Sequence, residues 1–194
     1  MPTIKQEIVG DGQRNRYRGG DEVRFSVVRT GGKTGLDATT PYIWSIKQHH
    51  NEHVHFVTAE YPGDGGILQI SDDSHAAEVS IWYETELIMV TDQGQKVRVT
   101  RILHPDVVGL DVSSVPSRAS MLWNGARQIS DQPIAAIVGQ RFTLEAPLIH
   151  YNGRTKNRFV RWEITTEGND EREIITERSF ELQVGVVKKS YVAR

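Results

Sequence analysis

The stretch IKQHHNEHVHF, residues 46–56, carries four of the seven histidines of this 194-residue chain. Neutral imidazole is a borderline ligand that suits zinc, copper and nickel. A carboxylate from Glu52 or Asp64 could add an oxygen ligand, and no thiolate ligand is available because the chain has no cysteine. The stretch is therefore a candidate zinc or copper site, built on His49, His50, His53 and His55.

Two backbone geometries could gather these imidazoles. In one continuous strand, alternate residues share a face, which would bring together His49, Asn51, His53 and His55. A tight turn at residues 51–52 would instead place His49 or His50 opposite His53 across a hairpin. Both geometries could assemble two or three imidazoles, so the sequence leaves the choice between them open.

Other interpretations of the stretch need no metal. The imidazoles could pack with Trp44, Phe56 and Tyr61 in a polar, hydrogen-bonded loop at the end of a sheet. They could also contact another ligand or respond to pH, because unperturbed imidazole titrates close to neutrality. The remaining histidines, His75, His104 and His150, stand apart in the chain and are interpreted as surface or loop residues.

The acidic pairs are weaker candidates for chemistry. Glu84 and Glu86 lie two residues apart, so on a strand they share a face and form a solvated stripe rather than the separated carboxylates of a glycosidase. YPGDGG, residues 61–66, and SDDS, residues 71–74, could offer oxygen ligands to calcium, but they lack the spacing of a helix-loop-helix site and are better interpreted as turns. No serine lies in the strand-turn-helix context of a hydrolase nucleophile.

The aromatic residues offer a different function. Exposed rings can stack on sugars, and Trp123 and Tyr151 each lie next to an Asn-Gly turn, where a ring could remain accessible. Trp82, in the strand-like run SIWYETELIMV, is a third candidate carbohydrate contact. All four tryptophans lie within β-like runs, however, so burial in a core is the competing interpretation.

The elements that must position these residues are strands. No window of twelve residues has helical apolar spacing, whereas alternating runs recur along the chain. EVRFSVV places Val23, Phe25 and Val27 on one side, and YIWSI does the same for Tyr42 and Trp44. Gly-rich and Asp-rich clusters separate the runs, and Asn124-Gly125 suits a type I′ hairpin turn. This pattern is typical of an all-β sandwich.

Bulk properties restrict the partners. The 23 basic and 25 acidic residues give a formal net charge of −2, which provides no electrostatic footprint for nucleic acid. The longest apolar runs are too short to span a membrane, and the first twenty residues lack the apolar segment of a signal peptide. Prolines at 105 and 116 flank a short extended stretch, which indicates a boundary between two units.

Several stretches, in order, resemble a known pair of modules. The first set resembles the PKD-like, immunoglobulin-type module near the carboxyl terminus of secreted bacterial sugar dehydrogenases of the glucose/sorbosone type: YRGGDEVRFS, YIWSIKQHHNEHVHF, GGILQIS, IWYETELIMVTDQGQ and ILHP. The second set resembles the β-sandwich that often follows it: VSSVPSRASMLWNG, IAAIVGQRFTLEAP, NRFVRWEI and KKSYVAR. The chain departs from that pattern at Phe56, where proline is usual, and in the charged loop TTEGNDEREI, where a Gly-Gly turn is common.

The resemblance implies two tandem immunoglobulin-like (PKD-like) β-sandwich domains: residues 1–106, with the histidine-rich loop, and a smaller domain at 107–194. Such modules are appended to catalytic domains, so it implies a non-catalytic accessory module of a larger secreted bacterial protein that acts on carbohydrate. Its partners would be a polysaccharide or cell-surface glycan and the parent's catalytic domain. Spacing of domains, metal binding, and adhesion or assembly through an open sheet edge are the alternative roles.

Overall fold

The computed structural model describes residues 2–29, 42–73, 79–90 and 94–194. The chain divides into two compact units. The first unit comprises Met1–Ile70 and Ser80–Pro105, and the second comprises Ser71–Val79 and Asp106–Arg194. The sequence places the boundary after residue 106, whereas in the structure it follows Pro105, and the described residues Ser71–Asp73 and Val79 group with the second unit.

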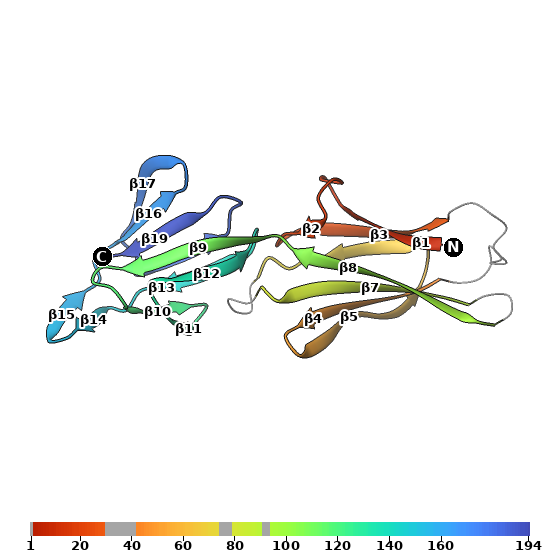
Figure 1. Ribbon diagram of the computed structural model, residues 1–194, viewed down its shortest axis with the longest axis horizontal. Helices are drawn as coiled ribbons and strands as arrows, with labels where there is room; N and C mark the ends of the chain where they lie inside the picture. Colours follow the sequence, from red (N-terminus) through yellow and green to blue (C-terminus); the bar gives the residue numbers. More distant parts are fainter. Residues whose placement is uncertain (1, 30–41, 74–78, 91–93) are drawn as a thin grey trace. The chain divides into compact units, whose positions relative to one another are not determined.

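The first unit is built from two β-sheets (Figure 1). Its strands are β1 (Pro2–Ile8), β2 (Arg16–Tyr17), β3 (Glu22–Arg29), β4 (Ile43–His50), β5 (His53–Pro62), β6 (Gly65–Gln69), β7 (Ile81–Val90) and β8 (Lys96–Pro105). One sheet has the order β1-β3-β6 and the other has the order β2-β8-β7-β4-β5. All neighbouring strands are antiparallel except β2 and β8, which are parallel.

The core of the first unit follows from the alternation of its strands. Val23 and Phe25 on β3 and Trp44 and Ile46 on β4 are all buried, as their spacing predicts. The rings of Phe25 and Trp44, from different sheets, have centroids 4.9 Å apart. Trp44 Nε1 donates a hydrogen bond to the carbonyl oxygen of Gly63 at 2.8 Å, so the buried indole keeps a partner for its polar atom.

The second unit contains two larger sheets and a separate hairpin. Its strands are β9 (Val107–Ser114), β10 (Ser120–Trp123), β11 (Ala126–Ile129), β12 (Gln132–Ile137), β13 (Arg141–Glu145), β14 (Ile149–Asn152), β15 (Thr155–Arg158), β16 (Trp162–Thr166), β17 (Asn169–Ile175), β18 (Ser179–Gln183) and β19 (Lys189–Ala193). The sheets have the orders β11-β10-β13-β18 and β12-β9-β19-β16-β17, and β14 pairs with β15 alone. The turn between β10 and β11 has positive φ at Asn124 (47°) and Gly125 (78°), as a type I′ turn requires.

Aromatic residues fill the core of the second unit. Trp123 and Trp162 have no exposed surface, and Phe142 is buried beside Trp123 with ring centroids 4.7 Å apart. Trp162 Nε1 donates to the carbonyl oxygen of Arg178 at 3.2 Å. Every regular element among the described residues of both units is a strand, so the predicted all-β class is confirmed. The immunoglobulin-like identity of each unit stays a prediction.

Gly65 allows a prediction about the packing of β6 against β3. A Cβ atom at Gly65, whose φ is +155°, would collide with the carbonyl oxygen of Phe25 and lie 3.0 Å from Ser26 Cα. Because both contacts are with backbone, Gly65→Ala is expected to lower the free energy of unfolding by about 3 kcal/mol. Denaturant titration followed by circular dichroism would measure the change.

The matched control is Gly109→Ala on β9, where a Cβ atom would meet nothing within 4 Å. This substitution is expected to change the free energy of unfolding by less than about 1 kcal/mol. Equal stability losses for the two alanine variants would contradict the backbone contact assigned to Gly65.

Candidate functional site

The histidine stretch forms a hairpin, not one continuous strand. Strand β4 ends at His50, residues 51–52 make the turn, and β5 begins at His53. Asn51 has φ of 49°, a conformation that asparagine tolerates better than most residues. His50 is directly opposite His53 in the β4–β5 register. Of the two predicted geometries, the hairpin is therefore confirmed.

The hairpin distributes the four histidines over both faces of the sheet. His50 lies directly opposite His53, and Gln48 directly opposite His55, so each pair points to one face. Gln48 and His50 lie two residues apart on β4, so both pairs share the same face. The rings of His50 and His55 have centroids 6.4 Å apart. His49 lies on the other face, so the structure does not bring all four imidazoles together. Within the described residues, no group of three or more histidines or carboxylates is arranged to hold a metal ion.

His49 belongs to the outer face of the β2-β8-β7-β4-β5 sheet, the face turned away from β1-β3-β6. Its ring stacks on Trp82, its neighbour on β7, with centroids 4.9 Å apart and an interplanar angle of 7°. His49 Nε2 is 3.0 Å from Glu84 Oε2, and since a carboxylate only accepts, Nε2 is the donor. These two contacts orient both rings.

Charged side chains continue from His49 along this face. Lys47 Nζ donates to Glu84 Oε1 at 3.1 Å and lies 3.6 Å from Glu86 Oε2. Glu86 Oε1 accepts a hydrogen bond from Arg98 Nη1 at 3.0 Å. Glu84 and Glu86 share a face, as predicted, but they lie in an ion-pair network instead of forming a freely solvated stripe.

The network shifts the pKa values of two members. Burial tends to raise the pKa of Glu84, but the hydrogen bonds and positive charges of Lys47 and His49 together lower it below its ordinary value. The hydrogen bond with Glu84 raises the pKa of Lys47, with burial opposing and the charges of Glu84 and Glu86 adding to the rise. Both groups are therefore held in their charged forms.

A pH dependence follows for Glu84. A carboxylate whose folded-state pKa is lowered stabilises the fold above its unfolded pKa, and this stabilisation is lost as pH falls through the folded value. Glu84→Gln is expected to lower the free energy of unfolding by about 1 kcal/mol at neutral pH. The free energy of unfolding of this variant should also fall less steeply than that of the wild type as the pH is lowered into the acid range. Denaturant titrations from neutral pH into the acid range would measure this. Glu52→Gln, in the exposed turn of the same hairpin, is the control because it makes the same substitution outside the ion-pair network. Equal losses of stability in the two variants would contradict the role assigned to Glu84.

Exposed apolar side chains border the network. In the β-sheet register, Phe56 lies opposite Lys47, Lys47 opposite Glu84, and Glu84 opposite Ile102, so these residues form one row across four strands. Phe56 is 69% exposed and Ile102 is 52% exposed. A parallel row contains Val54, which is 49% exposed, and then His49 and Trp82. We call this surface the platform: Lys47, His49, Val54, Phe56, Trp82, Glu84 and Ile102.

The platform combines the two kinds of contact that a sugar needs. Pyranose rings present C–H groups on their faces, which pack on apolar and aromatic surfaces, and hydroxyl groups at their edges, which hydrogen-bond to charged side chains. Neighbouring strands lie about 4.8 Å apart, so the row from Phe56 to Ile102 extends about 14 Å. This length can contact more than one sugar ring.

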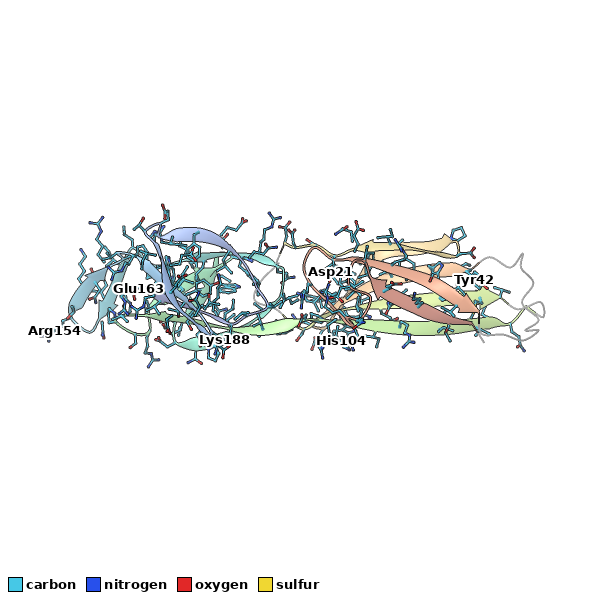
Figure 2. The ribbon with its side chains drawn as sticks, turned by 90° about the horizontal axis from the view of Figure 1, so that it is seen from above. Asp21, Tyr42, His104, Arg154, Glu163 and Lys188 are labelled. Atoms are coloured by element: carbon cyan, nitrogen blue, oxygen red, sulfur yellow. The ribbon has the colours of Figure 1, made fainter. Side chains whose placement is uncertain are left out.

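The three predicted carbohydrate contacts have different outcomes. Trp82 is partly exposed on the platform. Trp123 is completely buried, because alternation along β10 directs it and Met121 into the core, so its assignment as a sugar contact is corrected. Tyr151 is 62% exposed on the β14–β15 hairpin, opposite Lys156. Arg154, at the turn of this hairpin, is labelled in Figure 2.

His104 is exposed on β8, and His150 Nε2 is 3.2 Å from the carbonyl oxygen of Ser117 on the second unit, whereas His75 lies outside the described residues. Asp72 and Asp73, suggested as calcium ligands, instead accept hydrogen bonds from Arg141 at 3.1 and 3.2 Å.

Phe56 does not lie where the loop interpretation of the histidine stretch puts it. It is not packed with Trp44 in a loop, because it lies on the outer face and Trp44 on the inner one. Val54 and Phe56 lie two apart, and that spacing alone indicates a shared strand face. The position of Ile102 in the same row as Phe56 does not follow from local spacing. It depends on the pairing of β4 with β7, which are far apart in the sequence.

No protein-family model matches this chain, and the search of curated proteins found no similar sequence. In the part of the chain that the structure describes, no helix is long and apolar enough to cross a membrane.

Proposed function

We propose that this chain is a non-catalytic accessory module that binds polysaccharide or a cell-surface glycan through the platform. The observation that carries the proposal is the row Phe56–Lys47–Glu84–Ile102, with exposed apolar side chains at its ends and a hydrogen-bonded ion pair between them. A surface of this kind gives weak individual contacts, and tethering to a larger protein would increase the overall affinity.

The strand order of the first unit supports its assignment as an immunoglobulin-like sandwich. In its constant-type form, the first, second, fourth and fifth main strands share one sheet, and the third, sixth and seventh form the other. β1-β3-β6 and β8-β7-β4 follow this arrangement, except that the fourth main strand, β5, lies at the edge of the second sheet. The assignment of the second unit to the same class rests on the sequence resemblance and its paired sheets.

The resemblance also supports a setting for the proposed function. We place the chain in a secreted bacterial protein whose catalytic domain acts on carbohydrate, with this module holding that domain near its polymer. If the module binds no polymer, its role reduces to spacing the parent's domains.

Retention on polymers tests the proposal. The purified chain is mixed with suspensions of cellulose, chitin and peptidoglycan, and the unbound fraction is measured after sedimentation, alongside a soluble-glycan array. We expect saturable retention on at least one polymer or a hit on the array. No retention on any polymer and no array signal would contradict carbohydrate binding.

His50, His53 and His55 lie on the same face of the hairpin. This arrangement favours a second candidate function, the binding of zinc or copper. Rotation of these side chains would be needed to form a ligand set. Elemental analysis of protein purified without a nickel column would decide it. Stoichiometric zinc or copper, lost in a His53→Ala/His55→Ala variant, would support it, whereas trace metal and no thermal shift on adding zinc or copper would contradict it.

A further inference from the structure

Among the described strands, β1 has one unpaired hydrogen-bonding edge. It lies at the end of the β1-β3-β6 sheet, and within the described part of the chain it pairs with β3. The amide of Val9 donates to the carbonyl oxygen of Glu22 at 2.9 Å, which sets the phase of this ladder. In an antiparallel pair the backbone groups of successive residues alternate between the two sides. The odd-numbered residues of β1 therefore face β3, and the outward-facing ones are Ile4, Gln6 and Ile8.

Most of the outward-facing backbone groups have no hydrogen-bond partner among the described residues. The carbonyl oxygen of Ile4 accepts from Arg101 Nε at 3.3 Å, and that of Ile8 accepts from the amide of Asp11 at 3.1 Å. Each carbonyl oxygen has a second lone pair, and no described residue accepts from or donates to the backbone of Gln6 on this side. An unpaired edge of this kind is a template for strand addition.

A groove runs beside this edge. It has a volume of about 470 Å³ and is lined by residues 3–8 of β1, residues 12–15, residues 101–103 of β8, and Val23 and Val28 of β3. Arg14 borders it and is held by two hydrogen bonds to Asp21, at 2.9 and 3.0 Å; Figure 2 labels Asp21. Residues 3–8 of β1 therefore border open space.

The sequence of β1 is complementary to itself. Ile4-Lys5-Gln6-Glu7-Ile8 has the same apolar residue at both ends, opposite charges at the second and fourth positions, and an amide at the centre. When two such strands pair antiparallel about Gln6, each Lys5 lies opposite Glu7 of the second copy. Within one copy, Lys5 Nζ and Glu7 Oε2 are already 2.8 Å apart on the same strand face.

The charges select this register from those that the backbone phase allows. Outward-facing groups lie on even-numbered residues, so an antiparallel pair must match even with even, which registers centred on Lys5, Gln6 or Glu7 all do. The register centred on Lys5 would oppose two lysines, and the register centred on Glu7 would oppose two glutamates. Like charges directly opposite destabilise a strand pair, whereas opposite charges stabilise it. The register centred on Gln6 satisfies both the hydrogen bonds and the charges.

We propose that two copies of this chain associate through antiparallel pairing of their β1 strands, centred on Gln6. The contact is isologous, because the same edge serves both copies. It continues the β1-β3-β6 sheet of one copy into that of the second. The pairing site is separate from the platform, so dimerisation places two platforms in one particle.

Charge reversal tests the pairing. Sedimentation velocity over a concentration series into the millimolar range should show a monomer–dimer equilibrium for the wild type. Lys5→Glu alone and Glu7→Lys alone each oppose two like-charged pairs, so each should weaken the dimer about tenfold. The double variant Lys5→Glu/Glu7→Lys restores opposite charges and should dimerise like the wild type. An equimolar mixture of the two single variants should form a heterodimer.

Two further variants complete the design. Gln6→Pro removes the outward-facing N–H at the centre of the contact and should therefore abolish the dimer. The fold of the monomer should be kept, because an edge strand tolerates proline where its N–H faces away from the sheet. Lys156→Glu, on the exposed β15 strand, makes the same charge change elsewhere and should leave dimerisation unchanged. Circular dichroism confirms the fold of each variant. A wild type that stays monomeric throughout, or single variants that dimerise as well as the wild type, would overturn the proposal.

Discussion

Phe56→Ala is expected to reduce retention on the bound polysaccharide about tenfold while leaving the fold intact. The phenyl ring is 69% exposed, so truncating it removes little buried contact and should change the free energy of unfolding by less than about 0.5 kcal/mol. On the platform the same ring is an accessible apolar surface at one end of the row. Aromatic anchors of this kind commonly contribute about 1–2 kcal/mol to binding.

Two variants make this result specific. Ile129→Ala removes a side chain of comparable exposure on β11 of the second unit, which contains no platform residue, and should leave retention unchanged. Tyr151→Ala removes the exposed ring of the β14–β15 hairpin. Depletion isotherms on cellulose, chitin and peptidoglycan compare the variants. A loss of retention in Tyr151→Ala but not in Phe56→Ala would move the proposed binding surface to the second unit.

Trp123→Ala is expected to lower the free energy of unfolding of the second unit by about 4 kcal/mol, because it empties the space of a fully buried indole beside Phe142. Denaturant titration followed by circular dichroism measures the loss. At temperatures where the variant remains folded, its retention on polysaccharide should match the wild type, since the ring touches no ligand.

Trp123→Phe is the matched comparison. Nε1 of Trp123 has no hydrogen-bond partner among the described residues, so phenylalanine breaks no hydrogen bond and leaves a smaller cavity. We expect a loss of about 1–2 kcal/mol for this variant. Near-wild-type stability of Trp123→Ala together with lost retention would contradict the burial of this residue.

Local patterns predicted much of the fold. The alternation of Val23, Phe25 and Trp44 correctly identified strand faces, because a strand directs successive side chains to opposite sides. The Asn124-Gly125 turn was recognised for the same local reason: both residues adopt positive φ. Met121 and Trp123 lie two residues apart in β10, so the same alternation predicts that both face inward. The adjacent Asn-Gly turn instead suggested an accessible ring at Trp123.

The candidate site depends on information that local patterns do not hold. His49 and Trp82 are distant in sequence, and they stack only because the register of β4 and β7 places them opposite each other. The same register pairs Lys47 with Glu84 and converts a predicted solvated stripe into a network. Strand pairing of this kind is set by the whole sandwich, so the sequence identified Trp82 and His49 as candidates but for separate functions.

The footprint of a bound oligosaccharide tests the central claim most directly. Amide chemical shifts of the isotope-labelled chain would be recorded during titration with cellulose and chitin oligosaccharides and with soluble peptidoglycan fragments. Carbohydrate binding by the platform predicts concentration-dependent shifts centred on residues 47–49, 54–56, 82–84 and 102. Shifts confined to the second unit, or no shift with any of these ligands at saturating concentration, would contradict it.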